Sequence, residues 1–201
     1  MKYYFILISI ILSAFVAPAT VTAQSRDFLT EDEVEIIRDA QQIDQRIMVL
    51  THAIDRRLGV LKVNVGTSAK TEAKEWGPLP EGTRTQLLSD IKKILQKAID
   101  DVDNLSERPD SMVVQPDEDT KKNNKKKPQG FAELFPIAVR HLAAAADRFK
   151  PIFKSELDKT KDEADKGPIL DSLDMCDQIT AAVAKLPPEV RVVKDNKKTK
   201  H

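Results

Sequence analysis

Hydrophobic residues recur at helical spacing along most of this chain. From residue 30 to 61 they stand three or four positions apart, so at about 100° per residue they fall on one face of a helix. The members of this stripe are Ile36, Ala40, Ile43, Ile47, Leu50, Ile54, Leu58 and Leu61. Thr30 and Glu33 form a capping-box signature at its start. The pattern predicts one continuous amphipathic helix over 30–61, with the polar stretch 41–44 as the place where it could bend or break.

Three further stripes predict three more helices. The second helix is expected from about residue 81 or 83 to 105, after a glycine- and proline-rich loop, with the stripe Leu87, Leu88, Ile91, Ile94, Leu95, Ala98, Ile99, Val102 and Leu105. The third has the stripe Phe131, Phe135, Ala138, Leu142, Ala145, Phe149 and Phe153, and Pro151 predicts a kink in it. Gly167-Pro168 is the firmest break signal after it, with Pro168 suited to a helix's first position. The fourth helix runs to about residue 186 with the stripe Ile169, Leu173, Cys176, Ile179, Val183 and Leu186.

Four amphipathic helices indicate an all-α fold. We expect an antiparallel four-helix bundle over residues 24–186, since each stripe must be buried against its neighbours. Residues 106–130 contain three prolines and the lysine-rich run 121–127, with few apolar side chains. They are predicted to form a long mobile loop between the second and third helices. Residues 187–201 are predicted to be a disordered basic tail.

The first 23 residues are typical of a secretory signal. Lys2 supplies a positive start, residues 3–16 form an uncharged apolar run, and Val21, Thr22 and Ala23 resemble a signal-peptidase site. The run is shorter than the roughly 20 apolar residues of a membrane span. We therefore expect cleavage after Ala23, no membrane span in the mature chain, and a secreted or periplasmic location.

Composition limits the classes of partner and the cellular compartments that the sequence supports. The chain has 32 Lys plus Arg and 32 Asp plus Glu, so its formal net charge at pH 7 is zero. This balance gives no support for nucleic-acid binding, which needs a net basic footprint. Cys176 is the only cysteine, which rules out an intrachain disulfide and suits a bacterial envelope protein. The lysine clusters 121–127 and 194–200 are interpreted as solvated segments, with contact to anionic lipids or polymers as the alternative.

Candidate chemical residues are few. Met48 and His52 stand one turn apart on the first helix, where His52 is predicted to face solvent, and a pairing of Met48 with His141 is the main haem-binding arrangement left open. Cys176 falls on the apolar face and is interpreted as a core residue. A solvated face, and not a metal site, is predicted for the acidic residues Glu33, Glu35, Asp39, Asp44, Asp162, Glu163 and Asp165. We predict no catalytic, cofactor-binding or metal-binding residue.

The opening Leu29-Thr30-Glu31-Asp32-Glu33-Val34, placed directly after the signal, resembles that of uncharacterised secreted helical proteins of bacteria. The resemblance implies an exported helical fold and carries no residue role. The leading hypothesis is a non-enzymatic binding or structural component of the cell envelope whose partner is an unknown protein or envelope component. The alternative is a carrier that holds an apolar ligand between the helices, with a lining drawn from Phe131, Phe135, Phe149 and Phe153.

Overall fold

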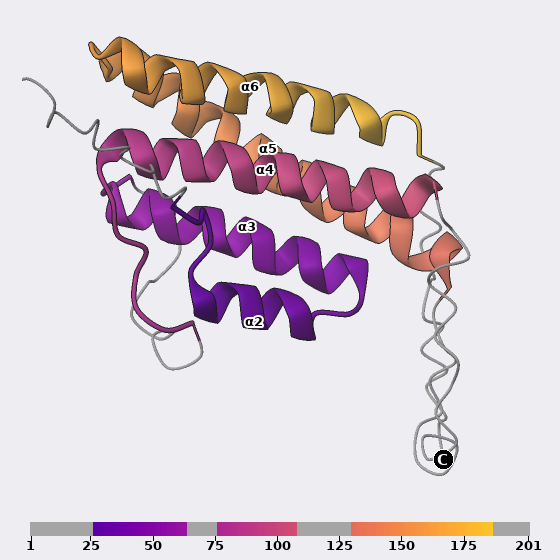
Figure 1. Ribbon diagram of the computed structural model, residues 1–201. Coiled ribbons are helices and arrows are strands. Elements are labelled where there is room, and N and C mark those ends of the chain that lie inside the picture. The colour runs from indigo at the N-terminus through magenta and orange to yellow at the C-terminus, as the bar shows by residue number, and fades with distance from the viewer. Residues whose placement is uncertain (1–25, 64–75, 108–129, 187–201) are drawn as a thin grey trace, which may run out of the picture.

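The computed structural model describes residues 26–63, 76–107 and 130–186, and within these ranges it contains helices and no strand. The helices, in chain order, are α2 (Glu31–Asp39), α3 (Ile43–Val60), α4 (Arg84–Glu107), α5 (Phe131–Lys159) and α6 (Glu163–Val183) (Figure 1). The predicted all-α class is therefore confirmed. The expected signal at 1–23 and tail at 187–201 lie outside the described residues. So does the loop at 106–130 apart from its ends, because Ser106 and Glu107 belong to the last turn of α4.

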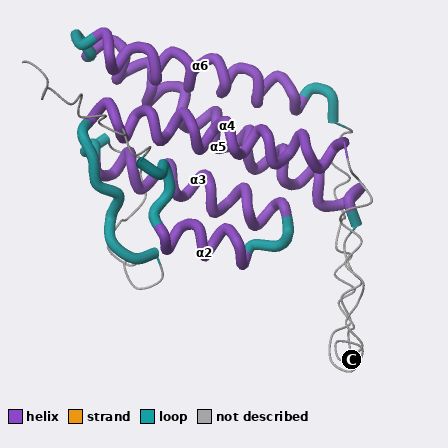
Figure 2. The backbone as a smooth tube through the Cα atoms, viewed as in Figure 1, coloured by secondary structure: helices purple, strands orange, loops and turns teal. Residues whose placement is uncertain are grey.

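The four long helices pack side by side, and α2 lies against α3 (Figures 1 and 2). Helices α3 and α6 each contact both α4 and α5. The first turns of α4 and α6 lie together, because Arg84 pairs with Asp165 and, two turns along, Lys92 pairs with Asp171. Helices α4 and α6 therefore run in the same direction. Helices α5 and α6 run in opposite directions because only residues 160–162 connect them.

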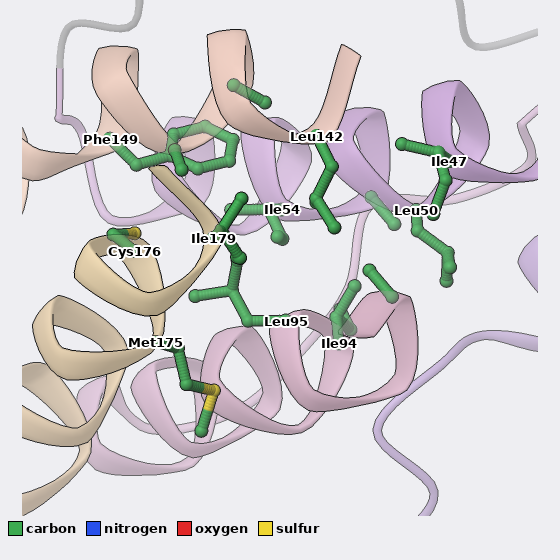
Figure 3. Close-up of a cluster of buried hydrophobic side chains, with 14 of the residues drawn as sticks. Ile47, Leu50, Ile54, Ile94, Leu95, Leu142, Phe149, Met175, Cys176 and Ile179 are labelled. Carbon is green, nitrogen blue, oxygen red and sulfur yellow. The ribbon is translucent and has the colours of Figure 1, made fainter. Parts of the chain in front are cut away.

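One hydrophobic core fills the space between the four long helices. Figure 3 shows side chains of all four meeting there: Ile47, Leu50 and Ile54 from α3, Ile94 and Leu95 from α4, Leu142 and Phe149 from α5, and Met175, Cys176 and Ile179 from α6. Most of these side chains are completely buried. At about 1.5 to 3 kcal/mol for each large apolar side chain, burial of these stripes is the main term that stabilises the fold.

The prediction of one continuous helix over 30–61 is wrong. Helix α2 ends when the N–H of Ala40 bonds to the carbonyl of Ile36, and Ala40 itself has a non-helical ψ of 79°. The side chain of Arg46 then donates to the carbonyl of Ala40 across the turn. The break lets α2 fold back onto α3, so that Ile37, and not the half-buried Ile36, enters the core. The described ranges therefore contain five helices where four were predicted.

The predicted break at Gly167-Pro168 is also wrong. Asp162 starts α6 by accepting a hydrogen bond from the N–H of Ala164, and the helix runs through Pro168 to Val183. Pro168 lies in the second turn, where its missing N–H costs one bond to the carbonyl of Ala164. Helix α5 likewise continues through Pro136 and Pro151. The chain turns at 160–162, between α5 and α6.

Candidate functional site

The lone cysteine lies deep in the packing between α5 and α6. Cys176 is fully buried within the core, as its place on the apolar stripe predicted. Burial, reinforced by the nearby Asp177 carboxylate, raises the pKa of the Cys176 thiol to about 12. Lys150, which forms an ion pair with Asp177 at 2.6 Å, offsets this only in part. The thiol is therefore protonated at neutral pH, whereas a nucleophilic cysteine needs a lowered pKa.

The residues considered for haem lie away from the core. Met48 on α3 is 48% exposed, and His141 on α5 is also exposed. His52 is half-buried, not solvent-facing as predicted, because its ring lies against Trp76 with centroids 4.2 Å apart. Among the residues that the structure describes, no group of three or more His, Cys, Asp or Glu side chains is placed to hold a metal ion.

The phenylalanines of α5 divide into two pairs. Phe149 and Phe153 are fully buried in the core with ring centroids 6.1 Å apart. Phe131 and Phe135 are half-buried and stack on each other at 5.0 Å at the start of the helix. Both pairs pack with the core cluster. An apolar ligand between the helices stays a prediction.

The most unusual feature of the described structure is a buried cluster of charges that joins α2 to α3 and reaches Asp90 of α4. Glu33 of α2 is 0% exposed, and its carboxylate faces two guanidinium groups of α3. Arg56 donates to Oε1 at 2.7 Å, while Arg57 donates to Oε1 at 3.0 Å and to Oε2 at 2.8 Å. The same carboxylate accepts from the N–H of Thr30, which confirms the predicted capping box. Glu33 thus caps α2 and also joins it to α3.

Arg57 extends the cluster to the N-terminal segment and to α4. Its guanidinium donates to the carbonyl of Phe28 at 2.6 Å and to the carbonyl of Ala53 at 2.7 Å. Its Nε lies 3.9 Å from Oδ2 of the buried Asp90 on α4. Arg26 pairs with the same Asp90 oxygen at 2.9 Å. Residues 26–29 are therefore fixed against the helices by charge as well as by packing.

Arg56 holds the loop that precedes α4. It donates to the carbonyls of Gly77 and Pro78 at 3.1 and 2.6 Å, and it lies 5.7 Å from the ring centre of Trp76. Gly77 has a φ of +62°, and a Cβ there would collide with the carboxylate of Asp32. The left-handed φ favours glycine at this position, where the loop passes beside the first turn of α2.

The pKa values of the two carboxylates in the cluster, Glu33 and Asp90, are shifted in opposite directions. Burial raises the pKa of Glu33, but the hydrogen bond and charge of Arg57, the Thr30 N–H and the charge of Arg56 outweigh it, so the pKa lies below its usual range. Burial also raises the pKa of Asp90, and there the charges of Arg26 and Arg57 and the hydrogen bond from Arg26 are not enough to reverse the effect. Glu33 is therefore the firmly ionised partner of the two arginines.

A second cluster fixes the α5–α6 turn to the start of α4. Arg84 donates to Glu156 at 2.8 Å and to Asp165 at 3.0 Å, and the hydroxyl of Thr85 donates to Asp165 at 2.5 Å. The hydrogen bond that Arg84 donates to Glu156 outweighs the effect of burial and raises the pKa of Arg84. A third contact links α3 with α5, where Arg148 donates to both oxygens of Asp55 at 2.6 and 3.0 Å.

The sequence-based interpretation missed these charges. It assigned Glu33 and Asp165 to a solvated face, and both are buried. The positions of Arg57 and Asp90 in the apolar stripes could have revealed them. Arg57 follows Leu50 by seven residues, and Asp90 lies three residues after Leu87 and four before Ile94. Charged residues on an apolar face are costly to bury unless paired, so their position indicates partners elsewhere in the fold. Glu35 and Asp39 are exposed as predicted.

Comparison with known proteins gives no family for this chain: no family model matches it, and neither does a curated protein or a solved structure. In the described part of the chain, no helix combines the length and the apolar character needed to cross a membrane. The candidate site is therefore interpreted from its own geometry. Its carboxylates are neutralised by arginines and sealed from solvent, which suits the joining of helices better than contact with a substrate.

Proposed function

We propose that this chain is an exported, non-enzymatic protein of the bacterial cell envelope that serves as a rigid binding or structural component. Helices α3 to α6 form its scaffold, a four-helix bundle in which consecutive helices run antiparallel. The signal-like residues 1–23 support the location. Cleavage after Ala23 starts the mature protein at Gln24.

One observation carries the non-enzymatic part of this proposal. Buried groups that could do acid–base chemistry are paired with opposite charges that join one element to another: Glu33 with Arg56 and Arg57, and Asp165 with Arg84. The one thiol is held protonated by burial. Catalytic groups must reach a substrate and change protonation near the working pH. These groups are instead buried, and the carboxylates among them are bonded to arginines.

Two measurements test the proposal. Cell fractionation followed by N-terminal sequencing should find the protein outside the cytoplasm, beginning at Gln24. A purified sample assayed against broad panels of hydrolase substrates should show no turnover above background. Turnover that is lost in Cys176→Ala or in His141→Ala would overturn the non-enzymatic proposal, and a cytoplasmic chain that keeps Met1 would overturn the exported one.

A further inference from the structure

A shallow groove of about 460 Å³ runs along the outer face of α4. Its lining consists of Phe28 and six residues of α4 between Lys93 and Asn104, spaced three and four apart. At 1.5 Å of rise per residue this row extends for about 16 Å along the helix. The groove is open along its length, so it suits an extended ligand better than a small enclosed one.

The polar wall of the groove has no net charge, because Lys93 and Lys97 balance Asp100 and Asp101. The ammonium group of Lys97 lies 3.2 Å from each carboxylate oxygen of Asp101, one turn along the helix. The side-chain amide of Gln96 donates to Asp100 at 2.8 Å. These pairs leave carboxylate and amide oxygens that still have acceptor capacity. An anion would meet two carboxylates there, and a cation would meet two lysines.

The apolar wall of the groove is Phe28, whose backbone is held by the buried charge cluster. The carbonyl of Phe28 accepts the hydrogen bond from Arg57, whose side chain is 1% exposed. Two residues earlier, Arg26 is tied to the buried Asp90. Phe28 is half-buried against the core, so part of it remains available in the groove. The buried charge cluster therefore has a second consequence, which is to hold the backbone of the one aromatic residue that lines the groove.

We propose that this groove binds a neutral oligosaccharide chain. Such a chain carries hydroxyl groups that suit carboxylate and amide oxygens, and each sugar ring has a C–H face that suits an apolar aromatic surface. Its extended shape matches a row of about 16 Å. This inference rests on the proposed function, because it names the ligand class of the envelope component that the protein binds.

The test uses the purified protein and three defined probes: cellotetraose, chitotetraose and maltotetraose. Titration of isotope-labelled protein should shift the backbone amide signals of residues 28 and 93–104 with at least one probe, and calorimetry should give its Kd. Gln96→Ala and Asp100→Ala should each weaken that binding about tenfold. Gln178→Ala and Asp174→Ala, at exposed positions of α6, are the matched controls and should leave Kd unchanged.

Several outcomes would overturn the inference. One is that none of the probes shifts the signals of 93–104 at millimolar concentration. Another is that Asp100→Ala binds as well as the unmodified protein while circular dichroism shows both to be folded. A neutral tetrapeptide that occupies the groove in preference to all three sugars would reassign it to peptide. These results are independent of cell location and turnover, so failure of the groove is distinguishable from failure of the proposed function.

Discussion

Replacement of Glu33 by glutamine is the sharpest test of the charge cluster. The substitution keeps the size and shape of the side chain and removes its charge. Arg56 and Arg57 would then remain buried, at 6% and 1% side-chain exposure, without the carboxylate that they share. Asp90 cannot take its place, because its nearest approach to Arg57 is 3.9 Å.

The expected loss of stability arises because the two arginines stay buried without a counter-charge. Removing one partner from a buried ion pair costs about 3 to 5 kcal/mol, because the remaining charge is left uncompensated. The capping of α2 survives in large part, since a glutamine at this position can still accept from the N–H of Thr30. We therefore expect Glu33→Gln to lower the free energy of unfolding by about 3 to 5 kcal/mol. Against a typical domain stability of about 5 to 15 kcal/mol, that loss is severe.

Urea unfolding followed by circular dichroism at neutral pH measures the effect. Glu35→Gln is the matched control, because Glu35 lies on the same helix and pairs with Arg38 in an exposed position. That control should lose less than about 1 kcal/mol, as exposed pairs do. If Glu33→Gln were within about 1 kcal/mol of the unmodified protein, the cluster would not stabilise the α2–α3 junction and the reasoning would fail.

Three further predictions concern single positions. The folded-state pKa of Asp90 is raised, so the stability that its protonation contributes is present below the unfolded value of 3.8 and is lost as the pH rises through the folded value. In urea titrations, Asp90→Asn should therefore gain stability relative to the unmodified protein as the pH rises from about 3 to 6. A difference in stability that stays constant over this range would contradict the prediction. Cys176 should react with a disulfide reagent at pH 8 about 1000-fold more slowly in the folded than in the unfolded protein, because its pKa is raised from 9.0 to about 12; comparable rates would place the thiol in solvent. Lys62 has a φ of 59° after the end of α3, so Lys62→Gly should stabilise the protein by about 1 kcal/mol in thermal unfolding, and an unchanged or lower melting temperature would show that this strain is absent.

Local features were predictable from the sequence, and the path of the chain was less so. The capping box of Thr30 and Glu33 was predicted correctly, because it depends on residues three positions apart. Continuity through Ala40 was predicted wrongly, because Ala40 and Ile43 face the core whether the helix continues or turns back. Apolar spacing alone cannot distinguish these paths, since a turn that preserves the buried face leaves the pattern intact.

The buried charges were missed for a different reason. Glu33 and Arg57 lie 24 positions apart, and their pairing depends on the turn at Ala40 that brings α2 back onto α3. A charged residue in an apolar stripe indicates that a partner exists, but only the tertiary path identifies it. The turn and the ion pair therefore depend on each other. Without the turn, Arg57 has no carboxylate within reach on α2. Without Glu33, the apolar contacts of α2 are those of Ile37 and the half-buried Val34. This mutual dependence implies that Glu33→Gln should release α2 before the four long helices separate, so that amide protection falls first in residues 31–39. Equal loss of protection across α2 and α5 would instead show that the molecule unfolds as one cooperative unit.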